Sequence, residues 1–281
     1  MSFSKVKSYA KINLALNVTG RLKKLHKIES IVSFINLHDL IFIKNIKNKD
    51  HKISFYGKFS KNISNNNTVK KLFQILDDIE LLKNKKFKVK IKKNIPQKSG
   101  LGGGSMNAAN ILNFLIKKKI IKINKKKLQN ICSLIGSDVI LGINSKCTIL
   151  KSNNDVKKFS GCPKFYTILV QPNFGCSTKI IYSGIKKLTK PKYNNPKKKM
   201  FSSKFLSNQE NALEKVAFLK YPKLKSIKSY IENLKNPIFV RMTGSGSLIV
   251  AYYQSKRDSE LAKVQFKRKF KNYWCNTSKT I

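Results

Sequence analysis

The chain has 281 residues and a formal net charge of +46, from 59 Lys and Arg against 13 Asp and Glu. Its hydrophobic fraction of 41% is enough to bury a sizeable core, and no apolar run approaches the roughly 18 residues that cross a bilayer. Because the first residues also lack the long apolar core of a signal peptide, we expect a globular cytoplasmic protein with no membrane association.

The positive charge alone would suggest a nucleic-acid partner. Nearly all of it is lysine, however, because the only arginines are Arg21, Arg241, Arg257 and Arg268. Arginine is preferred for bidentate contacts with bases and phosphates, and the lysines are spread along the whole chain. We therefore expect no specific nucleic-acid partner, although a positive field attracts anionic substrates such as nucleotides.

Cysteine and histidine spacing gives no sign of a metal site. The five cysteines are odd in number and never spaced as Cys-x-x-Cys, and the three histidines lack metal-ligand spacing. This excludes the usual zinc patterns and argues against a disulfide framework. We expect the cysteines to be reduced core residues.

The first half of the chain predicts a sheet with helices. Short or alternating apolar runs favour strands over residues 6–18, 28–37, 40–46, 53–56 and 87–95. Helical spacing of apolar residues is found over 68–79, 108–116 and 128–135. Turn residues separate the strands, which indicates a mixed or antiparallel sheet.

The second half repeats this mixture, so the fold class is α+β. Strand-like patterns occupy residues 145–170, and the Lys-, Pro- and Asn-rich stretch 186–199 predicts a flexible, exposed loop. The remaining predicted elements are helices over 208–219, 224–234 and 260–270, and strands over 238–242 and 248–253 around a glycine turn at 243–247.

A glycine-rich run between a strand and a helix is the strongest signal. It places glycine at positions 100, 102, 103 and 104. Without side chains, successive N–H groups can surround a phosphate, and the following helix start adds unpaired donors and a favourable dipole. Ser105 can cap the helix, or give its hydroxyl to phosphate or to bound magnesium. The residues that we expect to hold phosphate are Pro96, Lys98, Ser99, Gly100, Leu101, Gly102, Gly103, Gly104 and Ser105.

Other glycine motifs fit this run less well. A P-loop needs Gly-Lys-Ser/Thr after its second glycine, and Ser-Met-Asn follows here. A dinucleotide-binding fold would carry the motif in its first strand–helix turn, whereas nearly a hundred residues precede it. An ordinary flexible glycine loop is the remaining alternative.

The run resembles the second motif of the GHMP kinases, the family of galactokinase, homoserine kinase and mevalonate kinase. Residues 10–16 (Ala-Lys-Ile-Asn-Leu-Ala-Leu) look like that family's N-terminal motif, and residues 241–247 look like its C-terminal glycine motif. The resemblance implies a two-domain GHMP kinase fold that uses ATP and Mg²⁺. It implies a ribosomal-protein-like N-terminal domain over 1–150, with the phosphate loop and the catalytic residues. A C-terminal α/β sandwich over 151–281 would carry the second glycine motif, with the active site in the cleft between the domains.

Within the family, several segments are similar to members that act on a cytidine diphosphate-linked methylerythritol. These segments are residues 11–14, 25–26, 100–105, 136–139 and 211–214. The resemblance implies an ATP-dependent kinase that phosphorylates the 2-hydroxyl of 4-diphosphocytidyl-2-C-methyl-D-erythritol in non-mevalonate isoprenoid biosynthesis. We expect a monomer or a weak homodimer.

Phosphoryl transfer needs a group that accepts the proton of the attacking hydroxyl. Asp138 is the candidate base, because it follows a predicted helix amid apolar residues in a chain with few acids. The resemblance makes Lys11 its neighbour, where an ammonium would keep the carboxylate ionised. Asn13 lies two residues on along the same predicted strand and therefore faces the same side, toward substrate.

The remaining candidates concern substrate recognition. His26 is similar to the family residue that reads the cytosine edge, and Tyr182 could stack on the base. The family's aromatic residue before the histidine is replaced by Leu25. Thr243, Gly244 and Gly246 would let the second glycine turn approach the first loop and the substrate.

Two alternatives stay open at this point. Leu25 leaves room for another small-molecule kinase of the same family, of the homoserine or mevalonate type. A basic nucleic-acid-binding protein on a related fold is the alternative from a different class. Such a binding module has no need of Lys11, Asp138 and two glycine turns together.

Overall fold

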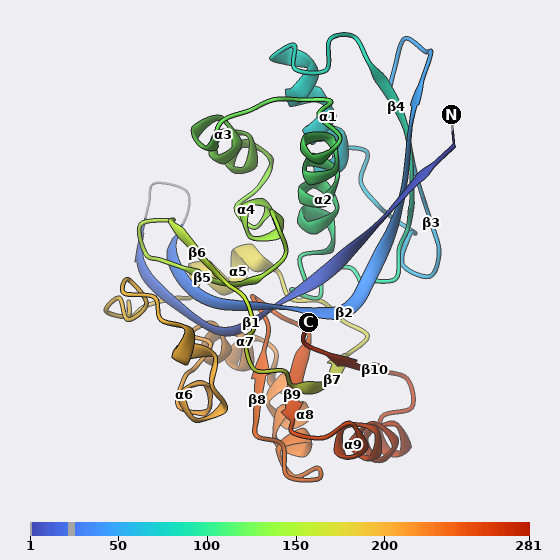
Figure 1. The fold of residues 1–281 in the computed structure, drawn as a ribbon. Helices are drawn as coiled ribbons and strands as arrows, with labels where there is room; N and C mark the ends of the chain where they lie inside the picture. Colours follow the sequence, from blue (N-terminus) through green and yellow to red (C-terminus); the bar gives the residue numbers. More distant parts are fainter. Residues whose placement is uncertain (1, 22–25) are drawn as a thin grey trace. The chain divides into compact units, whose positions relative to one another are not determined.

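The computed structural model describes residues 2–21 and 26–281 (Figure 1). Its helices and strands, in chain order, are β1 Ser4–Arg21, β2 His26–Ile46, β3 Lys52–Tyr56, α1 Thr68–Asp78, β4 Lys86–Lys92, α2 Gly103–Lys117, α3 Lys125–Ile135, α4 Val139–Gly142, β5 Cys147–Leu150, β6 Val156–Phe159, β7 Tyr166–Gln171, α5 Thr178–Ser183, the 3₁₀ turn Lys198–Phe201, α6 Ser203–Ser207, α7 Glu214–Lys220, α8 Pro222–Glu232, β8 Phe239–Met242, β9 Ile249–Tyr253, α9 Lys256–Lys269 and β10 Trp274–Lys279. No helix in the described ranges is long and apolar enough to cross a membrane.

The chain divides into two compact units that are interleaved in sequence. The first comprises the residues up to Lys11 with 37–97 and 102–145, and the second comprises 12–36, 98–101 and 146–281. The long strands β1 and β2 contribute residues to both units. The functional division of the chain at residue 150 stays a prediction.

The first unit packs helices against one face of a small sheet. Its β4 pairs antiparallel with the second half of β2 and parallel with β3. Every second residue of β4 (Phe87, Val89 and Ile91) is buried, as the Lys-apolar alternation predicts. On α1, apolar residues at helical spacing complete the same core, and α1 and α2 lie side by side against the sheet (Figure 1). The side chain of Asn67 caps α1 by accepting the N–H groups of Val69 and Lys70.

The second unit contains a four-stranded antiparallel sheet in the order β10-β7-β9-β8. Apolar residues of α8 and α9 pack on the face that carries Ile168, Ile249 and Ala251. A set of stacked and edge-on aromatic rings, Phe165, Phe239 and Tyr252, lies among the strands. The first half of β2 pairs with β5 elsewhere in this unit.

Most predicted elements are present, but residues 28–37 and 40–46 form one continuous strand and not two. The reason is Asp39, which was expected near a turn. It is fully buried, and its carboxylate accepts hydrogen bonds from protein donors in place of water. A strand can therefore continue across a buried aspartate when the carboxylate oxygens have hydrogen-bond donors.

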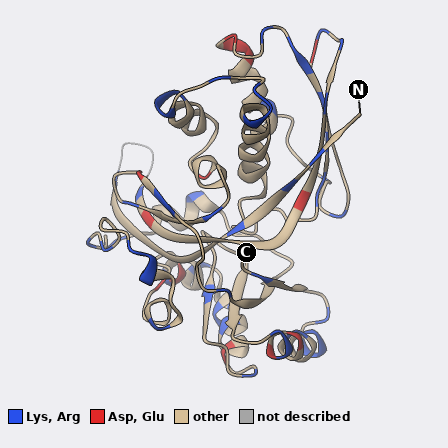
Figure 2. Cartoon of the chain, in the orientation of Figure 1, with Lys and Arg blue, Asp and Glu red and all other residues tan. Residues whose placement is uncertain are grey.

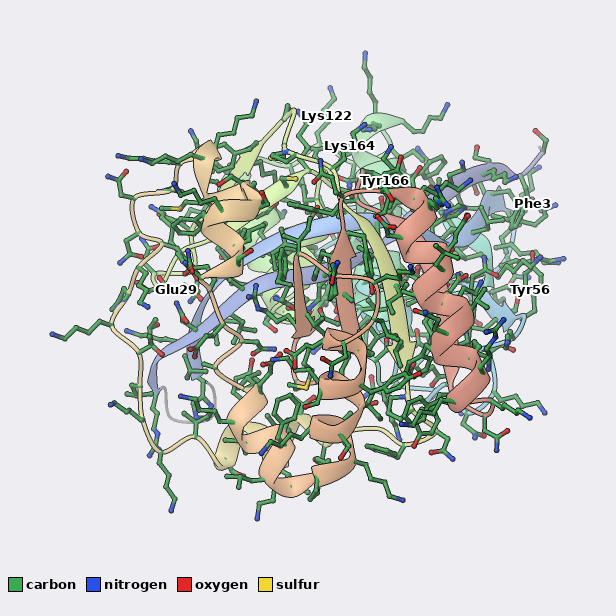
Figure 3. All side chains as sticks on the ribbon, turned by 90° about the horizontal axis from the view of Figure 1, so that it is seen from below. Phe3, Glu29, Tyr56, Lys122, Lys164 and Tyr166 are labelled. Atoms are coloured by element: carbon green, nitrogen blue, oxygen red, sulfur yellow. The ribbon has the colours of Figure 1, made fainter. Side chains whose placement is uncertain are left out.

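The stretch 186–199 is irregular, as predicted, but it is not an exposed loop throughout. The Tyr193 side chain is fully buried. The backbone N–H groups of Lys192 and Tyr193 donate to the carboxylate of Glu29, at 2.8 and 2.9 Å. Glu29 lies on β2 and is itself buried (Figure 3). A contact 164 residues apart in sequence thus anchors the segment.

Lysine and arginine are distributed over helices, strands and loops of each unit (Figure 2). Lys122 and Lys164, labelled in Figure 3, are two of the exposed lysines. Few lysines are buried, and those few have acidic partners, as Lys11 and Lys93 do. The distribution agrees with charge that is mostly carried by solvated side chains.

We predict that acidification destabilises the protein through His51. Its Nδ1 accepts the backbone N–H of Phe87 at 3.0 Å, and its ring packs on Phe73. Burial lowers the pKa of His51 below the usual 6.5. Below that pH, the His51 imidazole therefore binds a proton more readily in the unfolded chain than in the folded chain. The free energy of unfolding should therefore be fully retained above pH 6.5 and fall below it.

Urea unfolding at pH 7.5 and 5.5 measures this effect. His51→Gln should reduce the pH dependence by up to about 1 kcal/mol, since one proton over one pH unit corresponds to about 1.4 kcal/mol. An unchanged pH dependence in the variant would assign the effect to other groups.

Candidate active site

The start of α2 is open toward an anion. The helix begins at Gly103, and its N-cap, Gly102, has no side chain to accept the first N–H groups. The first turn also holds no acidic residue. Backbone donors and the helix dipole at such an end favour a negatively charged group. The arrangement fits the phosphate site that was predicted from the glycines.

Lys11 and Asp138 form an ion pair beside this helix start. Their Nζ and Oδ2 atoms are 3.3 Å apart, with side chains 4% and 31% exposed. Asp138 precedes α4, but its carboxylate makes no capping hydrogen bond there. Gly102 packs directly on the pair, since a Cβ at this residue would lie 3.0 Å from Lys11 Cγ and 3.7 Å from Asp138 Oδ2. The structure thus brings together the predicted base, the predicted lysine and the glycine loop.

Ser105 lies in the first turn of α2 and therefore does not cap the helix, contrary to one of its two predicted roles. It is partly exposed. Its Oγ is 4.0 Å from the place that a Cβ on Gly136 would take, two residues before Asp138. The hydroxyl is thus close to the segment that carries the candidate base, and its role in binding phosphate or magnesium stays a prediction.

The earlier part of the loop varies in exposure. Pro96, Ser99 and Leu101 are buried, whereas Lys98 is exposed. The Lys98 backbone has a positive φ of 50°, and its side chain packs over Gly175. Lys98 therefore covers a neighbouring segment of the second unit.

The two glycine turns meet within the second unit. Gly100 has a φ of 75°, and a Cβ there would lie 2.2 Å from the carbonyl oxygen of Thr243. A Cβ on Gly244 would meet the Gly100 backbone and Asn13 Oδ1 at 3.5 Å. A Cβ on Gly246 would face Met242 and Cys176. The Gly246 carbonyl oxygen, however, lies 3.5 Å from the place of a Cβ on Gly100, so the second turn approaches the first loop at both Gly244 and Gly246.

Asn13 links the first strand to this turn. Its backbone N–H donates to Thr243 Oγ1 at 3.0 Å, and its side-chain amide donates to Ser30 Oγ at 2.8 Å. Thr243 Oγ1 in turn donates to Asn13 Oδ1 at 3.3 Å. The Asn13 side chain is 3% exposed, so these partners hold it in one orientation.

His26 and Tyr182 lie together, as their predicted shared role requires. Their ring centroids are 5.2 Å apart, and the planes are inclined by 36°. Both side chains are partly exposed. Tyr182 is carried by the short helix α5, which Ser177 caps through the N–H of Ile180. Leu25, the residue that departs from the family pattern, lies outside the described residues.

The sequence did not predict the contacts of two residues that hold the glycine turns, Asp39 and Asn211. Asp39 contacts the residues just before the first loop and the helix after it. Asn211, which the sequence indicated only as part of the family-like segment 211–214, donates to the carbonyl oxygens of Met242 and Gly244 at 2.8 Å each. An acid within an apolar run of an acid-poor chain was the one available signal for Asp39.

Comparison with known proteins places these features in context. The family descriptions "GHMP kinases N terminal domain" and "GHMP kinases C terminal" match residues 67–148 and 185–272. A 4-diphosphocytidyl-2-C-methyl-D-erythritol kinase of Pelagibacter ubique is 59% identical over 281 residues, covering 100% of both chains. The enzyme of the same name from Petrotoga mobilis is 33% identical, covering 87% of this chain and 96% of its own. A solved 4-(cytidine 5'-diphospho)-2C-methyl-D-erythritol kinase has the same fold, with a TM-score of 0.79, 20% identity and coverage of 98% and 99%.

Gly102→Ala should destabilise the protein, because the backbone there is left-handed and the Cβ would press on Lys11. A side chain held in that conformation costs about 1–2 kcal/mol. Gly20→Ala is the control, since Gly20 lies on β1 without a positive φ and its nearest neighbours are flexible Lys27 atoms. It should leave the free energy of unfolding unchanged or raise it by up to about 1 kcal/mol. Equal stability of the two variants in urea would show that the loop relaxes freely.

Proposed function

The chain belongs to the GHMP kinases, and from this membership we propose that it transfers the γ-phosphoryl group of ATP to the 2-hydroxyl of 4-diphosphocytidyl-2-C-methyl-D-erythritol. The full-length identity with the Pelagibacter enzyme supports this substrate. The observation within the structure that carries the chemistry is the Lys11–Asp138 pair packed on Gly102, at the start of α2.

ATP binds through its phosphates at the glycine loop. The N–H groups at the start of α2 point along the helix axis, where the dipole also favours negative charge. Glycine at positions 102, 103 and 104 keeps side chains away from the bound phosphates. The proposed ATP-binding residues remain Pro96 and the segment 98–105.

Asp138 acts as the general base. Its carboxylate accepts the proton of the substrate hydroxyl, the hydroxyl oxygen attacks the γ-phosphorus, and ADP leaves. The partial exposure of Asp138 gives a substrate access to the carboxylate, while the ion pair with the buried Lys11 holds that carboxylate in place. Lys11 also offers positive charge near the transferring group.

Magnesium fits the site as an ion that enters with ATP. The described residues contain no group of three or more His, Cys, Asp and Glu side chains that could hold a metal ion by themselves. Mg²⁺ is often held by few protein ligands together with nucleotide phosphates, and Ser105 supplies a hydroxyl oxygen at the helix start. When bound, the ion would neutralise charge on the phosphate oxygens.

The second unit contributes groups suited to the rest of the substrate. Tyr182 offers an aromatic face for cytosine, and His26 next to it offers ring nitrogens for a base edge. Thr243, Gly244 and Asn13 form the candidate contacts to the erythritol part. The carbonyl oxygen of Gly246 lies beside Gly100 of the glycine loop, and Gly246 stays a candidate contact of the same turn.

Cytoplasmic location, a monomeric or weakly dimeric state, and the lack of a specific nucleic-acid partner remain predictions from sequence. They bear on how the enzyme meets its substrate and not on the chemistry at Asp138. A positive surface, with lysines over both units, would attract an anionic nucleotide whatever the oligomeric state.

Asp138→Asn should lower turnover by at least about a hundredfold, because the variant cannot accept the hydroxyl proton. ATP affinity, measured by calorimetry, should stay within about threefold of wild type. Asp78→Asn is the control, since it makes the same charge change at an exposed position of the first unit. Near-normal turnover of Asp138→Asn would remove Asp138 from the role of base.

Substrate choice is tested by ADP release with three acceptors offered separately: 4-diphosphocytidyl-2-C-methyl-D-erythritol, mevalonate and homoserine. We expect turnover with the cytidine-containing acceptor only. Replacing Tyr182 by Ala should then raise KM for that acceptor by about tenfold, as loss of base stacking does elsewhere. Turnover with mevalonate or homoserine alone would reassign the enzyme within the family.

A further inference from the structure

A buried carboxylate lies next to the phosphate loop and has no role in the chemistry described above. Asp39, in the middle of β2, is 0% exposed. Its Oδ1 accepts the backbone N–H groups of Asn94 and Ile95, at 2.7 and 2.9 Å. Its Oδ2 accepts the ammonium of Lys93 and, at 3.0 Å, the side-chain amide of Asn107. Four donors thus converge on one carboxylate.

These donors lie on both sides of the glycine loop. Asn94 and Ile95 follow the end of β4 and immediately precede Pro96, the first residue of the loop. Asn107 lies on α2, the helix that begins as the loop ends. One oxygen of Asp39 therefore holds the chain that enters the loop, and the other holds the helix that leaves it. All of these residues belong to the first unit.

Two of the residues around Asp39, Lys93 and Ile95, also pack against the first residue of α2. A Cβ on Gly103 would lie 3.1 Å from the Ile95 side chain and 3.4 Å from Lys93 Nζ, so the first residue of α2 rests on both. Lys93 is buried beside Asp39 and is 4% exposed. Without Asp39, its charge would be left uncompensated directly beneath the first turn of the helix.

We propose that Asp39 is the positioning residue of the phosphate loop, which fixes the N–H groups of α2 in the geometry that binds the nucleotide. The inference rests on the proposed function, because it takes the loop to be the ATP site. Asp39 touches neither substrate nor ATP in this scheme, and it acts through Ile95, Lys93 and Asn107. Its loss should weaken ATP binding more than it slows the chemical step.

Asp39→Asn tests the two carboxylate oxygens separately, because it keeps one as a carbonyl acceptor and replaces the other by an NH₂ donor. The new carbonyl can still accept the N–H groups of Asn94 and Ile95, but the new amide opposes the buried ammonium of Lys93, which has no acceptor to offer. We expect the Kd for ATP, measured by calorimetry, to rise by about tenfold. A change of this size corresponds to the loss of a hydrogen bond to a charged group. KM for ATP should rise in parallel, with a smaller change in KM for the phosphoryl acceptor.

A compensating variant provides the rescue. Asp39→Asn/Lys93→Met removes the unpaired charge, and Asn107 can then turn its amide toward the new donor. Its Oδ1 is buried and has no hydrogen-bond partner among the described residues, so the turn breaks no other hydrogen bond of that atom. The double variant should bring the Kd for ATP back to within about threefold of wild type. A purely destabilising effect of the first substitution would not be reversed in this way.

Glu29→Gln is the matched control. Glu29 is an equally buried carboxylate on the same strand that also accepts two backbone N–H groups, but in the second unit. It should lower the melting temperature while changing the Kd for ATP by less than about twofold. If Asp39→Asn does not fold, Asn107→Ala takes its place, since it removes only the helix contact and should raise the Kd about threefold.

The outcomes distinguish this inference from the proposed function. Wild-type protein that binds ATP but phosphorylates none of the acceptors would overturn the proposed function. The Kd values of the variants for ATP would still test whether Asp39 positions the loop. An unchanged Kd in Asp39→Asn, or in Asn107→Ala if that variant replaces it, would overturn the positioning role. An equal rise in Glu29→Gln would overturn it too.

Discussion

The glycine loop is closely packed at Gly100 and Gly102, where an added side chain would press on neighbouring atoms, and the rest of the site depends on this packing. The space beside Gly100 is taken by the Thr243 carbonyl, and the space beside Gly102 by Lys11. Left-handed backbone at both glycines turns the chain sharply into α2. Close backbone approach therefore serves two ends: it brings Lys11 and Asp138 to the helix start, and it brings the second glycine turn to the first.

In this strongly basic chain, buried carboxylates hold distant backbone segments in place. Asp39 organises the residues around the phosphate loop, Glu29 anchors residues 192 and 193, and Glu214 accepts the N–H of Met242 at 2.6 Å. Each carboxylate accepts backbone N–H groups, and Asp39 and Glu214 each also pair with a lysine, Lys93 and Lys228. Asp138 differs, because it keeps a third of its surface exposed beside a lysine. Exposure separates the candidate base from the carboxylates that hold the fold together.

Local patterns predicted most of the elements and the family. The period of α1, the alternation in β4 and the strand–glycine–helix order were all readable, because each depends on neighbours within a few residues. The predicted fold and kinase function are confirmed by the family matches and by the relatives. The roles of Asp138, Lys11 and the loop residues stay predictions, although the structure brings these groups together. The late start of α7 was missed, since Leu16 pairs with residues 210–212 and keeps them out of the helix.

The sequence by itself predicted a phosphate site made of backbone groups at a helix start, and it determined the family to which the chain belongs. Glycine spacing and short motifs carry that information, because the conformations they permit are local. Only the tertiary structure decided which side chains support the loop. Asp39 meets Asn107 across 68 residues, and Asn13 meets Thr243 across 230. Contacts at such separations depend on how strands pair and helices pack, which no short window of sequence records.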